Sequence, residues 1–458
     1  MQSSLRRNFI ILGVPIPWTG EEMAGYEDFV DLGYKPGAKD VLAVFKVKVP
    51  DWETPERAFG AIASESSVGT WTDLNIWAKY PQVKKVAAKV YSAEHTPDGY
   101  WIKIAYPEDH FEMENPSQIL ASIAGNVFGM KAVDSLKLQD IQFTKNMVKK
   151  YKGPGVGIEG IRKMFKAEKS PLTLSVPKPK VGMTTEEHAQ IGYDIWTGGL
   201  DLLKDDENLT NQKFNPFKKR VERTLKLRDK AEKETGEKKS YLVNITSPTV
   251  EEMLERARYV KKMGGEYVMI DIITSGWCAL NSLREECDDL GLAIHGHRAM
   301  HAAMTRNPDH GFSMNCIAKF SRLIGVDQLH MGTSVGKLVS PKDEVLQCQE
   351  ELTAKKSRAN MREHCLEQNW YGLKQTFPVS SGGLHPGIVD MIFKLFGTNI
   401  MIQLGGGVHG HPQGSYAGAV AMRAAIEAYL DKQSVEEKAK TCPELKEALK
   451  AWGRTLPK

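Results

Sequence analysis

The residues best suited to chemistry are one lysine and two acids at the end of a short apolar run, Lys204, Asp206 and Glu207. Alternate residues of a strand share a face, so Lys204 and Asp206 point the same way, and Glu207 can join them where the strand ends. Two carboxylates form a hard oxygen site of the kind that Mg²⁺ prefers. A lysine ammonium would repel the ion, but a neutral amine that has captured CO2 becomes a carbamate, a third anionic oxygen ligand. Such a stretch alone is more often a surface turn.

Other residues could bind phosphate groups. Glycines at 382–383 and 405–407 expose backbone N–H groups and let an anion approach closely, although either cluster alone could also be a tight turn that needs positive φ. Arg298, His330 and Ser381 form a second polar set able to bind another phosphate. Two such sets on opposite sides of a metal ion suggest a bisphosphorylated substrate.

Two further features are less specific. Lys337 lies in a glycine-flanked stretch of the kind that forms a movable lid. His295 and His297 could bind a metal ion or fill the core, and so short a motif alone favours the core.

These residues follow a repeated pattern of short apolar strands, each with a helix-like segment after it. The expected strands are 172–178, 200–207, 241–246, 268–273, 292–297, 328–333, 377–383 and 400–407. The number of units matches the eight of a (β/α)8 TIM barrel of about 250 residues. An open doubly wound sheet more often has fewer strands. Helix starts fit as well, since Thr184 and Glu187 have the spacing of a capping box. Barrel chemistry sits at the strand ends, where the polar residues above fall, and this position raises the metal site to an equal footing with the surface turn.

The chain divides into four parts, and the fold class is α/β. Residues 26–150 alternate strands with helical stretches and are expected to form a smaller α+β domain. The barrel follows at 151–440, a C-terminal helical tail at 441–458, and residues 1–25 are expected to be a disordered extension. Arg6 and Arg7 superficially resemble a twin-arginine export signal, but the apolar stretch after them is short and interrupted by prolines, and Met23 is an alternative start.

Composition excludes several classes of protein. The 61 Lys and Arg residues against 57 Asp and Glu give a net charge of +4, too mild for a nucleic-acid-binding face. Hydrophobic content of 41% and charged content of 26% exclude a disordered or fibrous chain. No apolar run reaches the roughly 18 residues of a membrane-spanning helix. Six scattered cysteines without a CxxC pair favour a reducing cytoplasm over a disulfide framework.

A set of motifs runs in order from about residue 26 to the C-terminus. They are Glu-Ser-Ser-Val-Gly-Thr-Trp-Thr at 65–72, Gly-Asn-Val-Phe-Gly at 125–129, Lys-Pro-Lys at 178–180, Lys-Asp-Asp-Glu-Asn at 204–208, His-Gly-His-Arg at 295–298, Gly-Lys-Leu at 336–338, Ser-Ser-Gly-Gly-Leu-His at 380–385 and Gln-Leu-Gly-Gly-Gly at 403–407. Together they resemble the large subunit of ribulose bisphosphate carboxylase (RuBisCO). The sequence around 176–182 and the His-Gly-His motif look most like the archaeal form III enzymes.

The resemblance implies a role for each matching catalytic residue. Lys204 would be the carbamylated lysine that binds Mg²⁺ together with Asp206 and Glu207, and its carbamate would take the C3 proton of ribulose 1,5-bisphosphate. Lys178 would manage protons at the reacting carbons, and Lys180 would support it.

The remaining residues match positions that orient and bind the substrate. His297 would assist hydration and orient the C3 oxygen, and Lys337 would stabilise the carboxylate that develops as CO2 adds at C2. One phosphate would be bound by Arg298, His330 and Ser381. The other phosphate would be bound by Thr70, Trp71, Gly383, Gly405 and Gly406. Gly382 and Gln403 are further expected substrate-binding residues.

The resemblance also implies an assembly. Glu65 and Asn126 would come from the neighbouring subunit, Glu65 pairing with Lys337 and Asn126 reaching the metal-bound substrate. We therefore expect a homo-oligomer built from dimers with shared active sites and no small subunit, acting on ribulose 1,5-bisphosphate with CO2 or O2. Form III membership suggests that the substrate comes from AMP and nucleotide salvage.

Two other enzyme classes share part of this pattern. A RuBisCO-like enolase or isomerase would not carboxylate, and the joint presence of Lys178, Lys337 and Glu65 argues against it. A metal-dependent amidohydrolase would carry its His-x-His pair on the first strand, before the lysine, whereas here the pair follows on the fifth.

Overall fold

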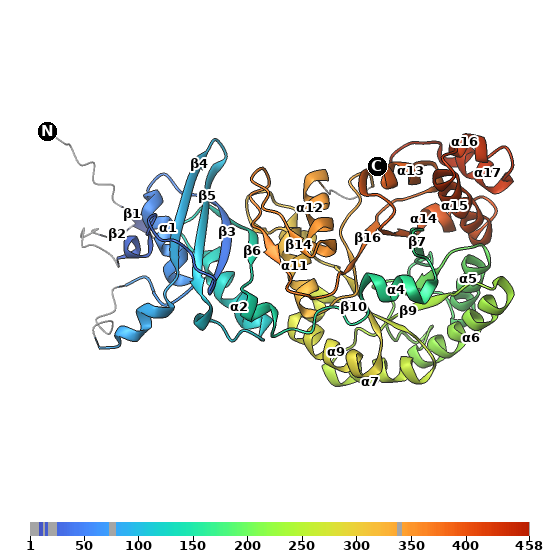
Figure 1. The fold of residues 1–458 in the computed structure, drawn as a ribbon, viewed down its shortest axis with the longest axis horizontal. Helices are drawn as coiled ribbons and strands as arrows, with labels where there is room; N and C mark the ends of the chain where they lie inside the picture. Colours follow the sequence, from blue (N-terminus) through green and yellow to red (C-terminus); the bar gives the residue numbers. More distant parts are fainter. Residues whose placement is uncertain (1–8, 12–13, 17–24, 73–78, 337–340, 458) are drawn as a thin grey trace.

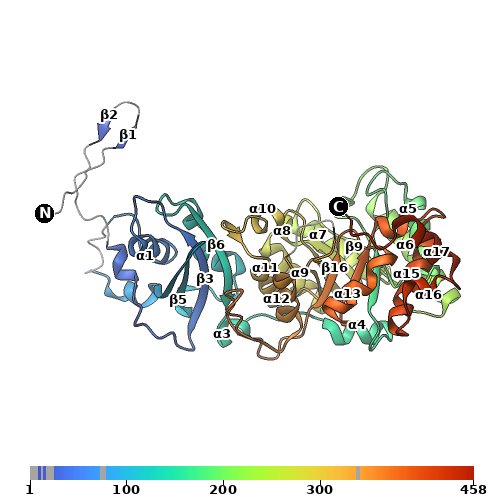
Figure 2. The ribbon, with the colours of Figure 1, turned by 90° about the horizontal axis from the view of Figure 1, so that it is seen from above.

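The computed structural model describes residues 9–11, 14–16, 25–72, 79–336 and 341–457. Figure 1 shows a smaller N-terminal body joined to a larger barrel, and Figure 2 shows the same two bodies side by side along the long axis.

The larger body is a closed barrel of eight parallel strands, in the order β10-β11-β13-β16-β17-β7-β8-β9. The strands are β7 (Leu172–Ser175), β8 (Leu202–Lys204), β9 (Ser240–Asn244), β10 (Tyr267–Asp271), β11 (Ala293–His297), β13 (Gln328–His330), β16 (Phe377–Ser381) and β17 (Met401–Leu404). All eight expected strands are confirmed. Most end a few residues earlier than predicted, because the polar residues and glycines that follow them belong to the loops at the barrel mouth.

Helices surround the barrel and alternate with its strands. The main ones are α5 (Thr185–Thr197), α6 (Phe217–Thr235), α7 (Val250–Lys262), α9 (Trp277–Leu290), α11 (Met314–Ile324), α12 (Lys342–Thr353), α13 (Val389–Phe396) and α15 (Ser415–Leu430). The capping box at the start of α5 is present, with the Thr184 side chain accepting from the Glu187 N–H and the Glu187 carboxylate accepting from the Thr184 N–H. At the far end of the chain, α17 (Pro443–Trp452) packs on α15.

One more helix closes the bottom of the barrel. Ile158, Ile161 and Phe165 of α4 (Gly157–Phe165) pack against the innermost strand residues in a cluster of their own. The mouth at the opposite end is therefore the face that is open to a ligand.

The N-terminal domain is a mixed sheet in the order β12-β6-β3-β5-β4. Its strands are β3 (Asp40–Lys48), β4 (Lys89–Thr96), β5 (Gly99–Pro107) and β6 (Ser135–Gln142), with α1 (Pro55–Glu65) and α2 (Pro116–Ile123) alongside. The fifth strand, β12 (Gly311–Phe312), comes from the barrel part of the chain and pairs with β6. Within residues 1–25, where we expected disorder, β1 (Phe9–Ile11) pairs with β2 (Val14–Ile16).

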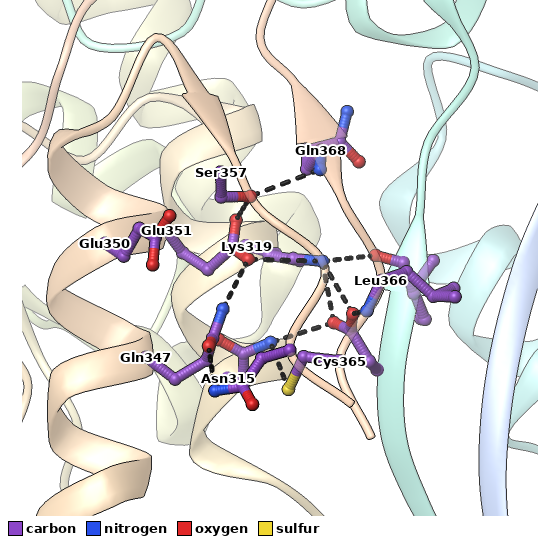
Figure 3. Close-up of polar contacts among 12 residues, drawn as sticks. Asn315, Lys319, Gln347, Glu350, Glu351, Ser357, Cys365, Leu366 and Gln368 are labelled. Carbon is purple, nitrogen blue, oxygen red and sulfur yellow. Dashed lines mark hydrogen bonds and ion pairs between the residues drawn. The ribbon is translucent and has the colours of Figure 1, made fainter. Parts of the chain in front are cut away.

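A buried ion cluster ties the two domains together (Figure 3). Lys319 of α11 lies with its Nζ 2.7 Å from Asp140 Oδ1 of β6 and 3.5 Å from Glu351 Oε1 of α12, and all three side chains have zero exposure. Asn315 and the Leu366 N–H also donate to Asp140. Because so many donors converge on Asp140, the junction between the sheet and the barrel is a fixed contact and not a loose hinge.

Two general findings complete the description. In the part of the chain that the structure describes, no helix is long and apolar enough to cross a membrane. The six cysteines all fall within that part, and all are free thiols.

Candidate active site

The lysine and two acids singled out in the sequence converge at the end of β8. Lys204 is fully buried, and its Nζ donates to the Asp205 carbonyl oxygen at 2.8 Å and lies 3.9 Å from Glu207 Oε2. Burial lowers the pKa of the Lys204 amine, and the surrounding carboxylates only partly offset this. A lowered pKa favours the neutral amine, which is the form that reacts with CO2.

The two carboxylates are held in their ionised forms. Burial alone would raise the pKa of Asp206, but the hydrogen bonds from Lys178 and Asn208 outweigh it, so this pKa is lowered. Burial would likewise raise the pKa of Glu207, and the charges of His297 and Lys204 reverse the shift. Both acids are therefore available as anionic oxygen ligands.

The lysines after β7 reach the same corner. Lys178 Nζ donates to Asp206 Oδ2 at 2.8 Å, and Lys180 Nζ lies 3.6 Å from Glu207 Oε1. These two lysines therefore lie beside the acids that follow β8.

His297 joins the site from the end of β11. Its Nδ1 lies 2.9 Å from Asp271 Oδ1 and its Nε2 lies 3.6 Å from Glu207 Oε2. Sequence reasoning missed Asp271, the last residue of β10, which sits beside His297 in the strand register. The available signal was a single acid at the end of the apolar run 267–270.

The predicted phosphate set is partly assembled. His330 Nδ1 lies 2.8 Å from Ser381 Oγ, so these two side chains meet between the ends of β13 and β16. Arg298 is 7% exposed, and its guanidinium makes no hydrogen bond or ion pair with any described residue. Burial lowers the pKa of Arg298 to about 10, which leaves it a cation at neutral pH. A buried, unpaired guanidinium is a strong candidate anion ligand.

The second histidine of the His-x-His pair lies deeper in the barrel. His295 Nε2 is 2.9 Å from His330 Nε2, and its Nδ1 is 2.9 Å from Gln328 Oε1. His295 thus fills the core and supports His330, whereas His297 belongs to the mouth.

The glycine clusters line the remaining side of the mouth. Gly382 and Gly383 have φ of +115° and +83°, which glycine adopts without the steric cost that a side chain would bring. A Cβ on Gly405 would stand 3.3 Å from Lys178 Cε, and Gly406 has open space where its Cβ would be. Gln403 precedes them on β17, and its buried Oε1 finds no partner among the described residues.

The N-terminal residues of the predicted site lie elsewhere. Glu65 ends α1 and accepts from Tyr26 OH at 3.0 Å, Thr70 lines a cavity of about 530 Å³ beside it, and Trp71 is 68% exposed. In both Figure 1 and Figure 2, α1 lies on the far side of the sheet from the barrel. Asn126 begins a short 3-10 helix in the same domain. The structure does not bring this group to the barrel mouth of its own chain, and Lys337 lies outside the described residues.

The residues at the mouth fit a divalent cation. Asp206 and Glu207 supply two hard oxygen ligands, and their carboxylates stand around the neutral-prone Lys204 amine, where a carbamate would add a third. Among the described residues, no three His, Cys, Asp or Glu side chains are grouped as a ready metal site. The carbamate oxygen on Lys204 would therefore be needed to complete the site.

Comparison with known proteins gives one consistent result. The chain matches the model of the ribulose bisphosphate carboxylase large chain catalytic domain over residues 157–452 and that of the N-terminal domain over residues 28–147. It is 49% identical over 433 residues to the ribulose bisphosphate carboxylase of Pyrococcus furiosus, covering 94% of this chain and 99% of that protein.

Solved structures agree. The dimeric archaeal RuBisCO from Hyperthermus butylicus has a TM-score of 0.88 at 42% identity and covers 94% of this chain and 100% of its own. The octameric RuBisCO from Pyrococcus horikoshii, in complex with a sulfate ion, has a TM-score of 0.86 at 46% identity, with 94% and 98% covered.

Proposed function

The chain belongs to the ribulose bisphosphate carboxylase large-chain family, and on this basis we propose that it carboxylates ribulose 1,5-bisphosphate to two molecules of 3-phosphoglycerate, with O2 as a competing substrate. The observation that carries the proposal is the corner at the end of β8, where a fully buried lysine amine stands beside two ionised carboxylates.

Lys204, Asp206 and Glu207 would hold Mg²⁺, with Lys204 as its carbamate. When bound, the ion and the carbamate would supply a Lewis acid and the base for the C3 proton of the substrate. Support comes from the burial of Lys204, which favours the neutral amine, the form that attacks CO2. The same residues would be the resident site of the activating CO2.

Lys178 and His297 would handle the remaining protons. The Lys178 ammonium, now 2.8 Å from Asp206 Oδ2, would move protons at the reacting carbons, and Lys180 would support it from the rim. Asp271 holds His297 through Nδ1 at 2.9 Å, which leaves Nε2 directed towards Glu207 and the mouth. His297 is thus oriented to act at the C3 oxygen and in hydration.

The two phosphates would bind on opposite sides of the corner. Arg298, His330 and Ser381 would take one, because they lie at the ends of the neighbouring strands β11, β13 and β16, where the buried guanidinium and the His330–Ser381 pair could both bind an anion. The other would bind at the backbone of Gly382, Gly383, Gly405 and Gly406, near Gln403.

The second phosphate site needs residues from another subunit. Thr70 and Trp71 follow α1, on the far side of the N-terminal sheet, and a symmetric dimer would carry them with Glu65 and Asn126 to the partner's barrel. Glu65 would pair with the partner subunit's Lys337. The named relatives include both a dimer and an octamer, which supports a homo-oligomer without a small subunit.

The biological setting is part of the same proposal. Likeness to archaeal enzymes supports form III and a supply of substrate from AMP and nucleotide salvage. Free thiols in all six cysteines support a reducing cytoplasm.

One variant tests the proposal against a RuBisCO-like enolase or isomerase. Lys337→Ala should still exchange the C3 proton of the substrate with solvent, because that step does not use Lys337. Carboxylation should fall by orders of magnitude, because the missing cation acts on charge that develops only as CO2 adds. Exchange and carboxylation would be followed by tritium release and by fixation of labelled CO2. A wild-type protein that exchanges the proton but fixes no CO2 would favour the enolase or isomerase.

A further inference from the structure

The end of β8 is held from behind by a buried acid between the proposed metal ligands. Asp205 has zero exposure and accepts from Tyr241 OH at 2.5 Å, from the Asn244 N–H at 3.0 Å and from Arg220 Nε at 3.3 Å. His188 Nε2 lies 3.2 Å from the same carboxylate. Four residues from three elements, α5, α6 and β9, therefore converge on one side chain that faces away from the mouth.

The guanidinium on Asp205 extends this anchor to the loop after β8. Arg220, at the start of α6, also donates to the carbonyl oxygens of Asn215 at 2.8 Å and Thr210 at 2.6 Å. The backbone on both sides of the loop is therefore tied to Asp205, and the loop carries Asp206 and Glu207 at its start.

Asn244 connects the anchor to the acids themselves. Its backbone N–H donates to Asp205, while its side-chain Nδ2 donates to the carbonyl oxygens of Glu207 at 3.2 Å and Asp206 at 3.4 Å. Asn244 Oδ1 in turn accepts from the Thr246 N–H at 3.0 Å, which fixes the amide plane. One fully buried residue thus holds the peptide groups of both proposed metal ligands.

We propose that Asp205 and Asn244 are positioning residues for the metal centre. They set the direction of the Asp206 and Glu207 carboxylates by fixing the backbone from which these side chains project. The inference rests on the proposed function, since it needs Mg²⁺ at this corner. Mg²⁺ demands near-octahedral geometry at about 2.0–2.1 Å, so small displacements of its ligands weaken binding strongly. Loss of a partner that orients metal ligands typically costs about 10- to 100-fold in metal affinity.

The test is metal binding by the full-length protein, with Mn²⁺ as the probe. Free Mn²⁺ is measured by electron paramagnetic resonance during titration of wild type and Asn244→Ala, with and without bicarbonate. We expect CO2-dependent binding in wild type and a Kd raised about tenfold or more in Asn244→Ala. A Kd within twofold of wild type would overturn the inference.

A matched control separates positioning from general loss of packing. Asn315 is also a buried asparagine, but it lies at the domain junction, where its Nδ2 donates to the Asp140 carboxylate. Asn315→Ala should lower the thermal midpoint and leave the Mn²⁺ Kd unchanged. An equal rise of Kd in both variants would overturn a specific positioning role for Asn244.

A second variant covers failure of the first to fold. Tyr241→Phe removes only the hydroxyl that donates to Asp205 and should raise the Mn²⁺ Kd about threefold or more, and an unchanged Kd would overturn the inference. Absence of CO2-dependent Mn²⁺ binding in the wild type would instead refute the metal site of the proposed function, and with it the premise of this inference.

Discussion

Replacing Lys178 with methionine should strengthen metal binding while abolishing turnover. Lys178 Nζ lies 2.8 Å from Asp206 Oδ2, so its ammonium holds an oxygen that the cation would need. Asp206 is 2% exposed and the Lys178 side chain 31% exposed, so the contact is partly screened by solvent. Methionine keeps an unbranched side chain that is one atom shorter, and it removes the charge.

The size of the effect follows from that contact. A hydrogen bond to a charged group contributes about 1.5–3 kcal/mol, which partial exposure of Lys178 reduces to about 1–2 kcal/mol. At 1.4 kcal/mol per tenfold, the Lys178→Met protein should bind Mn²⁺ about 5- to 30-fold more tightly. Carboxylation should nevertheless be lost, because the proton transfer at the reacting carbons that we assign to Lys178 would have no ammonium to perform it.

The assay is the same Mn²⁺ titration at saturating bicarbonate, with Lys180→Met as the matched control. Lys180 is 54% exposed and its Nζ lies 3.6 Å from Glu207 Oε1. An exposed ion pair of this kind contributes about 0.5 kcal/mol, so the control should shift the Kd by roughly twofold. The reasoning is refuted if Lys178→Met binds Mn²⁺ no more tightly than wild type, or if the control shifts more than the test variant.

Three further outcomes are expected. Because burial lowers the pKa of Lys204, activation by CO2 should rise with pH through a midpoint below the usual range of lysine. The folded Lys204→Arg protein should be inactive, because arginine forms no carbamate. Full activity in that variant would exclude the carbamate. Co-expressed Glu65→Ala and Lys204→Ala chains, each inactive alone, should regain about a quarter of wild-type activity. About half of the dimers are mixed, and each mixed dimer has one intact site of its two. Mixed dimers without activity would show that Glu65 and Lys204 serve a site built within one chain. Asp140→Asn should lower the free energy of unfolding by about 3–5 kcal/mol in urea titrations, because it leaves the buried Lys319 ammonium without its main partner. A change below about 1 kcal/mol would contradict a stabilising role for the ion cluster at the domain junction.

Much of the barrel could be predicted because its signals are local. Each strand is a short apolar run, and the capping box at Thr184 marks the start of α5 within four residues. The barrel rule then places residues that follow different strands at one mouth, which is how Lys178, Asp206 and Glu207 could be grouped before their contacts were known.

The contacts that were missed join residues distant in sequence. Asp271 contacts His297 because β10 and β11 are paired in register. A single acid after an apolar run does not indicate which strand is its neighbour. Two other contacts depend on how the two domains pack, namely the pairing of β12 with β6 and the Lys319 cluster. The hydrophobic periodicity of either domain does not predict that packing. The sequence also could not predict that His295 lies deeper in the barrel than His297, since the alternation of a strand puts both side chains on the same face.

The most direct test of the central claim is product analysis with the purified protein. The protein is incubated with ribulose 1,5-bisphosphate, Mg²⁺ and ¹⁴C-labelled bicarbonate, and the products are separated by chromatography. The account predicts labelled 3-phosphoglycerate that forms only when both Mg²⁺ and the bisphosphate are present, and faster after pre-incubation with CO2 and Mg²⁺. Consumption of the bisphosphate without any labelled 3-phosphoglycerate would contradict it.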